Sequence, residues 1–380
     1  MDKERAKLFF LSVILSGSLL WPSGAAAQRL LPDSYYMHSL TEIYPPVLPH
    51  DEIKLVFIGD VMLHAKQIDK EYGPFLEDLK PLFSEADVAV ANMETTLAGE
   101  PYSGYPAFSS PDNYADYVAS LGTDVFLTAN NHTMDMGTKG FIRTLKYYAG
   151  MEGVKFTGGT IKEIPDSMVN PLILKVKGAR IALLNFTYGS NKGLPDPSTG
   201  ARLQLMKKED VSVLLKRAQN AGADYIIALP HWGVEYDLNH SDSQEKMARW
   251  LADEGVDLII GSHPHVVQDT CIIKTADGRR VPVIYSLGNA VSNMSIENSR
   301  LELAATVTLS RFFPGQVTLE SLHLEFLWCT LPGMLLENTY KTVIVREREG
   351  KRDLWLNGKD YDNMMATMRR VKTKTGIGKD

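Results

Sequence analysis

Two histidines one residue apart, His263 and His265, directly follow the apolar run of residues 256–260. This run has the length and the β-branched composition of a buried strand, so the histidines stand at its carboxyl end. Imidazoles at such a position are typical metal ligands or general acids and bases. One His-x-His taken alone is more often an ordinary pair of loop histidines, but here the pattern recurs along the chain.

Four other strand-like runs end in residues of the same chemical kind. They are residues 53–58, leading to Asp60; 86–91, leading to Glu94; 123–128, leading to Asn131 and His132; and 223–229, leading to His231. The carboxyl ends of parallel strands meet at one edge of an open α/β sheet, where sites are built. Oxygen and imidazole donors suit Mn, Fe or Zn, and the lack of thiolates argues against a structural zinc. The sequence therefore predicts a divalent-metal site at this edge.

The elements that must position these residues alternate between strand and helix up to about residue 280. Helices are predicted at residues 66–84, 114–121, 140–148, 207–221 and 243–254, and a further strand at 180–186. Beyond residue 280 the pattern predicts strands at 281–285, 303–309, 316–326 and 339–346, then a helix at 359–371 and a frayed lysine-rich tail at 372–379. Two segments rich in Gly and Pro, 102–113 and 188–200, are predicted loops over the carboxyl edge of the sheet.

The amino-terminal segment has the order of a secretory signal. Lys3, Arg5 and Lys7 precede an apolar stretch over residues 8–20, and small residues follow at 25–27. The stretch is shorter than the roughly 20 residues that a spanning helix needs, and no cysteine follows it for a lipid anchor. We predict a signal peptide over residues 1–27, an extended lead-in over 28–52, and an exported product that is soluble in the periplasm or outside the cell.

The charge balance limits the class of partner. A net charge of -6 without a basic block argues against nucleic acid and against a long polyanion held by charge alone, although a local basic groove stays open. Cys271 and Cys329 are the only cysteines, so no disulfide framework carries the fold. Whether these two pair stays open.

Taken together, the motifs resemble the CapA family of capsule and poly-gamma-glutamate synthesis proteins, over about residues 53–295. The motifs that carry the resemblance are Gly59-Asp60-Val61-Met62, Asn92-Met93-Glu94, Asn130-Asn131-His132-x-x-Asp135-x-Gly137, His231-Trp232-Gly233-x-Glu235-Tyr236, Gly261-x-His263-Pro264-His265 and Ser286-Leu287-Gly288-Asn289. Each motif is weak alone, but all of them occur in the family's order.

That family is similar to the calcineurin-like metallophosphoesterases, which implies an α/β fold with a four-layer α/β/β/α sandwich and two metal ions. The implied domain covers residues 53–330, followed by a carboxyl-terminal strand, helix and basic tail over 331–380. The resemblance implies the following roles: Asp60 and His265 bind the first metal, Asn131, His231 and His263 bind the second, Glu94 bridges them, and His132 is the general acid.

Two positions depart from the phosphoesterase pattern. Met62 stands where a histidine ligand is expected, and Glu94 replaces a bridging aspartate. We therefore expect one tightly bound metal and a second that is weak or absent. His64 is near in sequence to the lost position but is expected to point elsewhere, and Asp135 is expected to fix a histidine or cap a helix rather than bind metal.

Four further residues are candidates for substrate binding. Trp232, Glu235 and Tyr236 directly follow a ligand histidine, and they offer an aromatic wall with one carboxylate for an amine or hydroxyl. Trp232 is equally well explained as a core residue. Asn289 either contacts substrate or closes a turn after Gly288.

The resemblance implies a role in making, exporting or anchoring a capsular polymer such as poly-gamma-glutamate. The expected partners are an anionic cell-surface polymer or its precursor and membrane-bound polymer synthesis or export proteins. The residues themselves support a metal-dependent hydrolase acting on a phosphoester or an amide. The alternative is a non-catalytic polymer-binding or assembly factor with a degenerate metal site, which the methionine at position 62 favours.

Overall fold

Strand β1, Asp51–Val61, is the central strand of a seven-stranded sheet in the computed structural model, which describes residues 50–313 and 316–378. On one side β1 runs parallel to β2, Val88–Met93, followed by β3, Val125–Leu127, and β4, Lys155–Thr157. On its other side lie the antiparallel strands β13, Leu301–Phe313, β14, Gln316–Thr330, and β15, Lys341–Ile344. The predicted signal peptide and residues 28–49 of the predicted lead-in lie outside the described residues.

A second sheet of six strands has the order β11-β12-β10-β9-β7-β6. Its parallel centre consists of β7, Ala179–Thr187, β9, Tyr225–His231, β10, Leu258–Ile260, and β12, Arg280–Ile284. Antiparallel strands β6, Leu172–Val176, and β11, Thr270–Lys274, form its edges. A small two-stranded sheet pairs β5, Gly159–Thr160, with β8, Arg202–Leu203.

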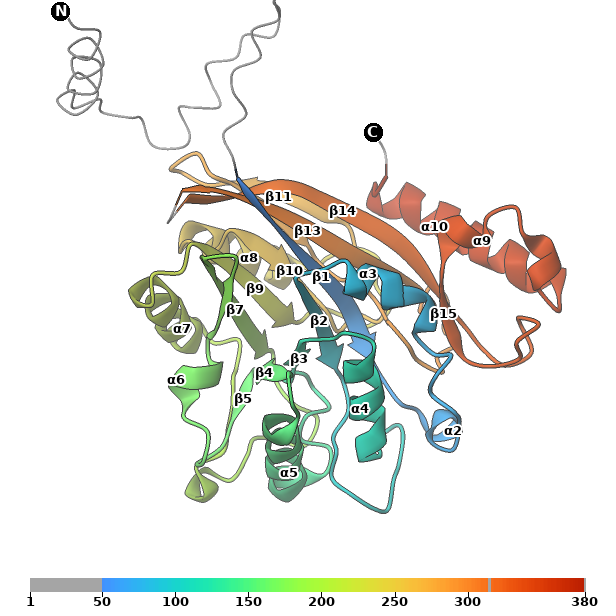
Figure 1. Cartoon of the computed structure of the whole chain (residues 1–380), viewed down its shortest axis with the longest axis horizontal. Helices are drawn as coiled ribbons and strands as arrows, with labels where there is room; N and C mark the ends of the chain where they lie inside the picture. Colours follow the sequence, from blue (N-terminus) through green and yellow to red (C-terminus); the bar gives the residue numbers. More distant parts are fainter. Residues whose placement is uncertain (1–49, 314–315, 379–380) are drawn as a thin grey trace, which may run out of the picture. The chain divides into compact units, whose positions relative to one another are not determined.

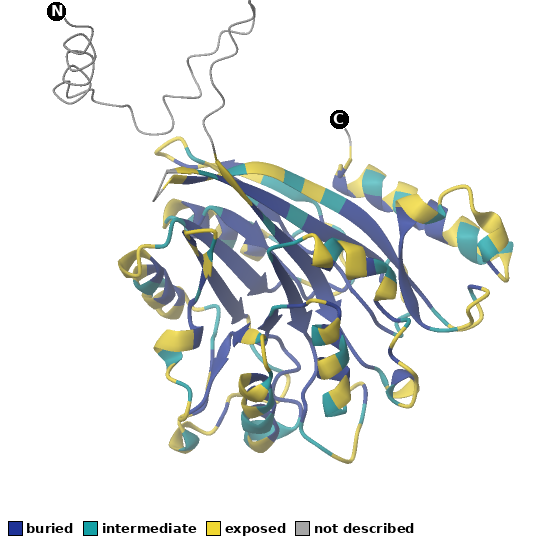
Figure 2. Ribbon diagram, in the orientation of Figure 1, coloured by how far each residue is buried: buried dark blue, intermediate teal, exposed yellow. Residues whose placement is uncertain are grey.

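Alternation along β1 shows how the two sheets are layered. Leu55 and Phe57 belong to the apolar cluster shared by the inner faces of both sheets, whereas Val56 and Ile58 belong to the cluster under helices α3, α4 and α5. A third cluster joins the outer face of the six-stranded sheet to α7 and α8. These three apolar clusters separate four layers, and most of the strand residues are buried, as the dark blue of the ribbons in Figure 2 shows. The predicted α/β/β/α sandwich is confirmed.

Most predicted helices agree with the structure to within a few residues. They are α4, Asp112–Ser120; α5, Gly137–Gly150; α7, Lys208–Asn220; and α8, Asp242–Asp253 (Figure 1). The single helix predicted over residues 66–84 is wrong, because the chain forms three short turns there: α2, Ala65–Ile68; a 3-10 turn, Glu77–Leu79; and α3, Lys80–Ser84. Gly73 and Pro74 interrupt the helical pattern between them.

The carboxyl-terminal segment is part of the same structure. After β15 come α9, Val345–Arg348, a 3-10 turn, Arg352–Leu354, and α10, Gly358–Thr375. Met364 and Val371 of α10 pack into the apolar cluster between the sheets. The predicted frayed tail is therefore wrong for residues 372–375, which are helical, and the helix ends at Gly376 in a left-handed conformation with φ 76°.

Two short helical elements lie between β5 and β6 and between β7 and β8. They are α6, Asp166–Val169, and a 3-10 turn, Pro197–Thr199.

Within the described residues, no helix is both long and apolar enough to cross a membrane. Cys271 and Cys329 are both free thiols, which answers the question of pairing that the sequence left open.

Candidate metal centre

The carboxyl ends of β1, β2, β9 and β10 bring five titratable side chains together. Asp60 is the next-to-last residue of β1, and Glu94 follows β2. His231 ends β9, and His263 and His265 follow β10. All five are at most 4% exposed. Two sets of three, Glu94 with His231 and His263, and Asp60 with Glu94 and His265, place one donor atom each within 4.8 Å of one another. The structure thus brings the predicted titratable ligands into one cluster.

Asp60 is positioned by close contact between two backbone segments. The strand continues through this residue, with a register shift between Ile58 and Asp60. Only glycine fits at position 59, because a Cβ there would lie 2.0 Å from the carbonyl oxygen of Gly288. The carboxylate accepts hydrogen bonds from the Asn92 side chain at 2.7 Å and from the His263 backbone N–H at 3.3 Å.

Glu94 is the residue whose surroundings point most directly to a cation. Both of its carboxylate oxygens are buried and accept no hydrogen bond from the described residues. Its Oε1 lies 3.5 Å from Nε2 of His231 and 3.9 Å from Nε2 of His265. Burial, and then the neighbouring charge of Asp60, raise the pKa of Glu94 well above its ordinary value. A carboxylate with no donor between two imidazoles fits a bridging metal ligand.

His231 and Asn131 present their donor atoms to each other. Nε2 of His231 lies 2.8 Å from Oδ1 of Asn131, and its Nδ1 lies 3.0 Å from Oγ of Ser262. Adjacent ligands of a cation bound at about 2.1 Å lie about 3 Å apart, so the separations to Asn131 and Glu94 suit a common cation. Burial, and then the charges of His263 and His265, lower the pKa of His231 well below its ordinary value, so the ring is neutral and one of its two nitrogens keeps a free lone pair.

Asn289 fixes which nitrogen of His265 is available. The Asn289 amide donates to the carbonyl oxygens of His265 at 3.2 Å and Ser299 at 3.0 Å, so its Oδ1 must accept from Nδ1 of His265 at 2.9 Å. This leaves the lone pair of His265 on Nε2, the nitrogen nearer to Glu94. Asn289 is fully buried, and the contacts that the structure shows for its side chain orient His265.

The loop that carries the paired histidines is conformationally strained. His263 has φ 101° and His265 has φ 57°, values that residues other than glycine rarely adopt. The ring of His263 packs against Tyr188, with ring centres 4.8 Å apart, and its Nδ1 is buried without a hydrogen-bond partner. Burial, and then the charge of His265, lower the pKa of His263 to about 3.

His132 is held in a buried pair with Asp135. Its Nδ1 lies 2.7 Å from Oδ2 of Asp135, which also accepts the backbone N–H of Phe108 at 2.8 Å. The Phe108 ring meets the imidazole edge-on, with centres 4.7 Å apart. Asp135 therefore fixes a histidine, as expected, and a carboxylate on Nδ1 orients Nε2 of His132 for proton transfer.

His64 does not take the place of the lost histidine. Its Nδ1 accepts the backbone N–H of Asn293 at 3.2 Å, so in the neutral ring the proton sits on Nε2 and no lone pair remains for a metal. Burial, and then the charge of His265, lower its pKa to about 4. Met62, which stands where the phosphoesterase pattern has a histidine ligand, is fully buried. Neither residue joins the metal-binding clusters of the described part of the chain.

The remaining candidates for substrate binding separate into two groups. Trp232 is fully buried in the cluster between the six-stranded sheet and the helices, with its indole N–H donating to the Tyr285 carbonyl at 2.9 Å, so it is a core residue and no pocket wall. Glu235 is exposed, and one of its oxygens lies within 4.8 Å of donor atoms of His263 and His265. Tyr236 is partly exposed, with its ring centre 6.1 Å from that of His265.

Several contributing residues were missed from the sequence. Asn92 bonds Asp60, and Asn130 donates to the Asn92 side chain at 3.3 Å and to the carbonyl of Met93 at 2.9 Å. The spacing of two between Asn92 and Glu94 was a usable signal, because it places both on one face of a strand. Glu302 accepts the N–H of Gly59 at 2.9 Å across 243 residues of sequence, a pairing that no local pattern indicates.

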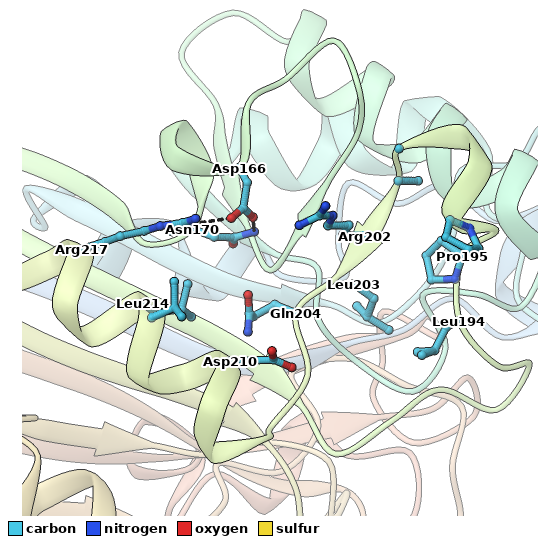
Figure 3. A pocket seen from close by; sticks show the side chains of 14 residues that line it. Asp166, Asn170, Leu194, Pro195, Arg202, Leu203, Gln204, Asp210, Leu214 and Arg217 are labelled. Carbon is cyan, nitrogen blue, oxygen red and sulfur yellow. Dashed lines mark hydrogen bonds and ion pairs between the residues drawn. The ribbon is translucent and has the colours of Figure 1, made fainter.

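A separate cavity of about 420 Å³ lies between α6, α7 and the segment of residues 194–204 (Figure 3). Its walls carry both signs of charge, with Arg202 and Arg217 against Asp166 and Asp210. Arg217 is paired with Asp166. None of the cluster's ligands lines this cavity, so the metal centre is a different site.

Comparison with known proteins gives a family match. The family described as "Bacterial capsule synthesis protein PGA_cap" matches residues 54–294. The capsule biosynthesis protein CapA of Bacillus anthracis is 30% identical over 271 residues, covering 66% of this chain and 63% of that protein. The PGA biosynthesis protein CapA of Bacillus subtilis is 27% identical over 260 residues, covering 66% of each chain. The matched region thus spans slightly less than two thirds of either relative.

Among solved structures, the NAD nucleotidase NadN of Haemophilus influenzae is similar with a TM-score of 0.48 and 12% identity, covering 86% of this chain and 68% of that chain. A putative 5'-nucleotidase from Staphylococcus aureus has a TM-score of 0.48 and 13% identity, covering 84% and 58%. The family match includes every residue of the candidate cluster described above, from Asp60 to His265. The chain belongs to the bacterial capsule synthesis protein family PGA_cap.

Proposed function

We propose that this protein is an exported, metal-dependent hydrolase that takes part in the synthesis, export or anchoring of a capsular polymer such as poly-gamma-glutamate. The observation that carries the metal-dependent part is Glu94, a buried carboxylate with no hydrogen-bond donor that lies between His231 and His265. The polymer comes from the family, whose Bacillus members are named for capsule and PGA biosynthesis. The location in the periplasm or outside the cell comes from the amino-terminal signal pattern.

The ligand set divides into two unequal sites. Asn131, His231, His263 and Glu94 would hold one cation, with the number of donors that a first-row metal needs before water completes its shell. Asp60, His265 and a share of Glu94 would hold the other. Bound divalent cations would activate a water and neutralise charge developing on a phosphoryl or carbonyl oxygen.

His132 is proposed as the general acid that protonates the leaving group. Its Nδ1 lies 2.7 Å from Oδ2 of Asp135, so this carboxylate can accept the Nδ1–H and fix the orientation of Nε2 for proton transfer. The ring is also near enough for its charge to lower the pKa values of His231 and His263. This proximity to His231 and His263 supports the proposed role of His132 in proton transfer.

The rim of the centre suits a substrate that carries polar groups on a flexible chain. Tyr188 and Tyr236 lie beside His263 and His265, and the Glu235 carboxylate lies among them. Such a rim offers hydrogen bonds and aromatic surface to a polymer segment while the cations face its scissile group. The anionic polymer or its precursor, and membrane-bound synthesis or export proteins, are the partners that this proposal implies.

The test is hydrolysis by the chain without residues 1–27, with Mn²⁺ added after metal removal. Bis(p-nitrophenyl) phosphate and poly-gamma-glutamate are offered as substrates, with parent, His132→Ala and the control His323→Ala. His323 is exposed on β14 and outside the metal cluster. We expect His132→Ala to lose about 100- to 10,000-fold in rate with its metal content unchanged, because one positioned acid is removed. An undiminished rate in His132→Ala would show the catalytic assignment to be wrong.

A second candidate function is a non-catalytic polymer-binding or assembly factor. The observation that favours it is Met62, a buried thioether where the phosphoesterases have a histidine ligand. Under this reading the parent binds poly-gamma-glutamate, measured by co-sedimentation, but turns over neither substrate with any of Mn²⁺, Fe²⁺ or Zn²⁺. The two candidates therefore give opposite results in one set of assays.

A further inference from the structure

We propose that Glu235 is a metal ligand: it supplies, from the solvent side, the donor that the cation held by Asp60 and His265 loses through Met62. The inference rests on the proposed metal-dependent function and goes beyond it, because it gives the exposed carboxylate a role in metal binding. It also accounts for how the weaker of the two sites can be filled.

The first support is the position of the carboxylate. One oxygen of Glu235 lies within 4.8 Å of a nitrogen of His265, the imidazole that also belongs to the set with Asp60 and Glu94, and of a nitrogen of His263. His265 presents Nε2, because Asn289 fixes its Nδ1 as a donor. His263 keeps Nδ1 buried without any hydrogen-bond partner. A cation bound by these histidines would need a further donor on the side that faces solvent, and Glu235 is the exposed carboxylate next to them.

The second support is the way the backbone holds Glu235 over the histidines. The N–H of Tyr236 donates to the carbonyl oxygen of Pro264 at 2.8 Å, which ties the Glu235 loop directly to the loop between the two histidines. Tyr236 has φ 67°, so it shares the strained conformation of His263 and His265. Strain of this kind at three positions on two joined loops persists only where the surrounding structure fixes it.

The third support is charge. Two divalent cations bring four positive charges, whereas Asp60 and Glu94 supply two negative charges and the imidazoles are neutral. Glu235 adds a third negative charge at the rim.

The number of donors and the exposure of Glu235 together describe a second cation that is bound but exchanges readily. With Glu235, the first cation has Asp60, His265, a share of Glu94 and one further carboxylate, which approaches the donor number of the second site. A ligand on an exposed side chain can leave without unfolding the loop, so this cation exchanges more readily than the one inside. An anionic substrate group arriving at the same face would compete with Glu235 for the cation.

The test is isothermal titration of the metal-stripped chain lacking residues 1–27 with MnCl₂, using parent, Glu235→Gln and Glu209→Gln. Glu209 is a similarly exposed glutamate on α7 and serves as the matched control. We expect two classes of site in the parent and in the control. In Glu235→Gln the weaker class should lose at least about tenfold in affinity, the lower limit for removing even an outer-shell partner, while the tight class is retained.

Absorption spectra with Co²⁺ in place of Mn²⁺ provide a second readout, because the d–d bands report coordination number. In Glu235→Gln, only the absorption spectrum that arises from the second equivalent of Co²⁺, bound at the weaker site, should change. Unchanged affinities, or an equal weakening of both classes as expected from a field effect alone, would overturn the inference while leaving the proposed function intact. A single class in the parent would overturn it as well. A parent that binds no metal would remove the proposed metal-dependent function itself.

Discussion

Neutral, buried imidazoles are the residue-scale feature on which metal binding here depends. Burial lowers the pKa of His263 to about 3 and that of His231 well below its ordinary value. Protons therefore compete weakly for these lone pairs at neutral pH. Glu94 is the opposite case, since burial raises its pKa and a bound cation must displace its proton. Metal uptake should accordingly release a proton and weaken as the pH falls.

The two ligand sets predict unequal losses of metal on substitution. His231→Ala should remove the tightly held metal, because it deletes an imidazole facing Glu94 and Asn131. His265→Ala should remove only the weaker one, whose remaining donors would be Asp60, part of Glu94 and the proposed Glu235. The measurement is metal content per chain by elemental analysis after gel filtration.

His323→Ala is the control for removal of a histidine, since it lies exposed on β14. Its metal content should equal that of the parent. An unchanged content in His231→Ala would contradict the ligand assignment as a whole. Equal losses in His231→Ala and His265→Ala would contradict only the ranking of the two sites.

At the scale of elements, the site depends on how closely the end of β1 approaches the segment after β12. A Cβ on Gly59 would lie 2.0 Å from the Gly288 carbonyl oxygen, and backbone cannot rotate away as a side chain can. Gly59 also donates its N–H to Glu302 at 2.9 Å. These two contacts fix the strand end that carries Asp60.

Gly59→Ala should therefore destabilise the fold by about 1 to 3 kcal/mol, the usual cost of overpacking, and should weaken metal binding by moving Asp60. Gly73→Ala is the matched control, because a Cβ at Gly73 meets nothing within 4 Å. Urea unfolding of the metal-free proteins gives the free energy of unfolding, and titration with MnCl₂ gives the affinity. A Gly59→Ala protein as stable as the Gly73→Ala protein would contradict the close contact.

Prediction from sequence succeeded for features that depend on the residues of a single strand or helix. The strand runs and the polar residues at their ends could be found because period, length and β-branched composition are local. The 66–84 helix failed because Gly73 and Pro74 outweigh the apolar spacing around them. Trp232 could not be assigned, because the residue after a strand-end histidine faces either the site or the helices, and only the packing against the outer cluster decides.

Long-range pairings explain what else the sequence did not reveal. Asn289 bonds His265 from 24 residues away, and Glu302 bonds Gly59 from 243 residues away. The roles of such residues depend on the register between distant segments, which local patterns do not encode. The family resemblance gave the ligand order, but it did not indicate that an exposed carboxylate, Glu235, approaches the two histidines.

At the scale of the whole molecule, buried neutral histidines make stability depend on pH. Burial lowers the pKa of His64 to about 4, from 6.5, and its Nδ1 accepts a backbone N–H that a protonated ring could not accept. Between these two pH values the unfolded chain binds a proton at this ring that the folded chain does not. Stability from His64 is therefore fully present above about pH 6.5 and is lost as the pH falls toward 4.

The prediction is a difference between parent and His64→Gln, whose side chain can still accept from Asn293. Between pH 7.5 and pH 5.0 the metal-free parent should lose about 1 to 2 kcal/mol more of its free energy of unfolding than the variant. Glu94 and Glu302, whose pKa values burial raises, act in the opposite direction but equally in both proteins. Urea unfolding at the two pH values measures the difference, and equal losses would contradict the neutral, buried state of His64.

The donors of the centre come equally from the two sheets. In the seven-stranded sheet, Asp60 lies near the end of β1, and Glu94 and Asn131 follow β2 and β3. In the six-stranded sheet, His231 ends β9, and His263 and His265 follow β10. Between the sheets lies an apolar layer that includes Val90 and Leu183. A cation bound by donors from both sheets would hold the two sheets together, and the thickness of the apolar layer would determine how far apart the two sets of donors lie. Substitutions deep in the layer, far from any ligand, should thus retune metal affinity, and affinity would in turn register any sliding of one sheet over the other.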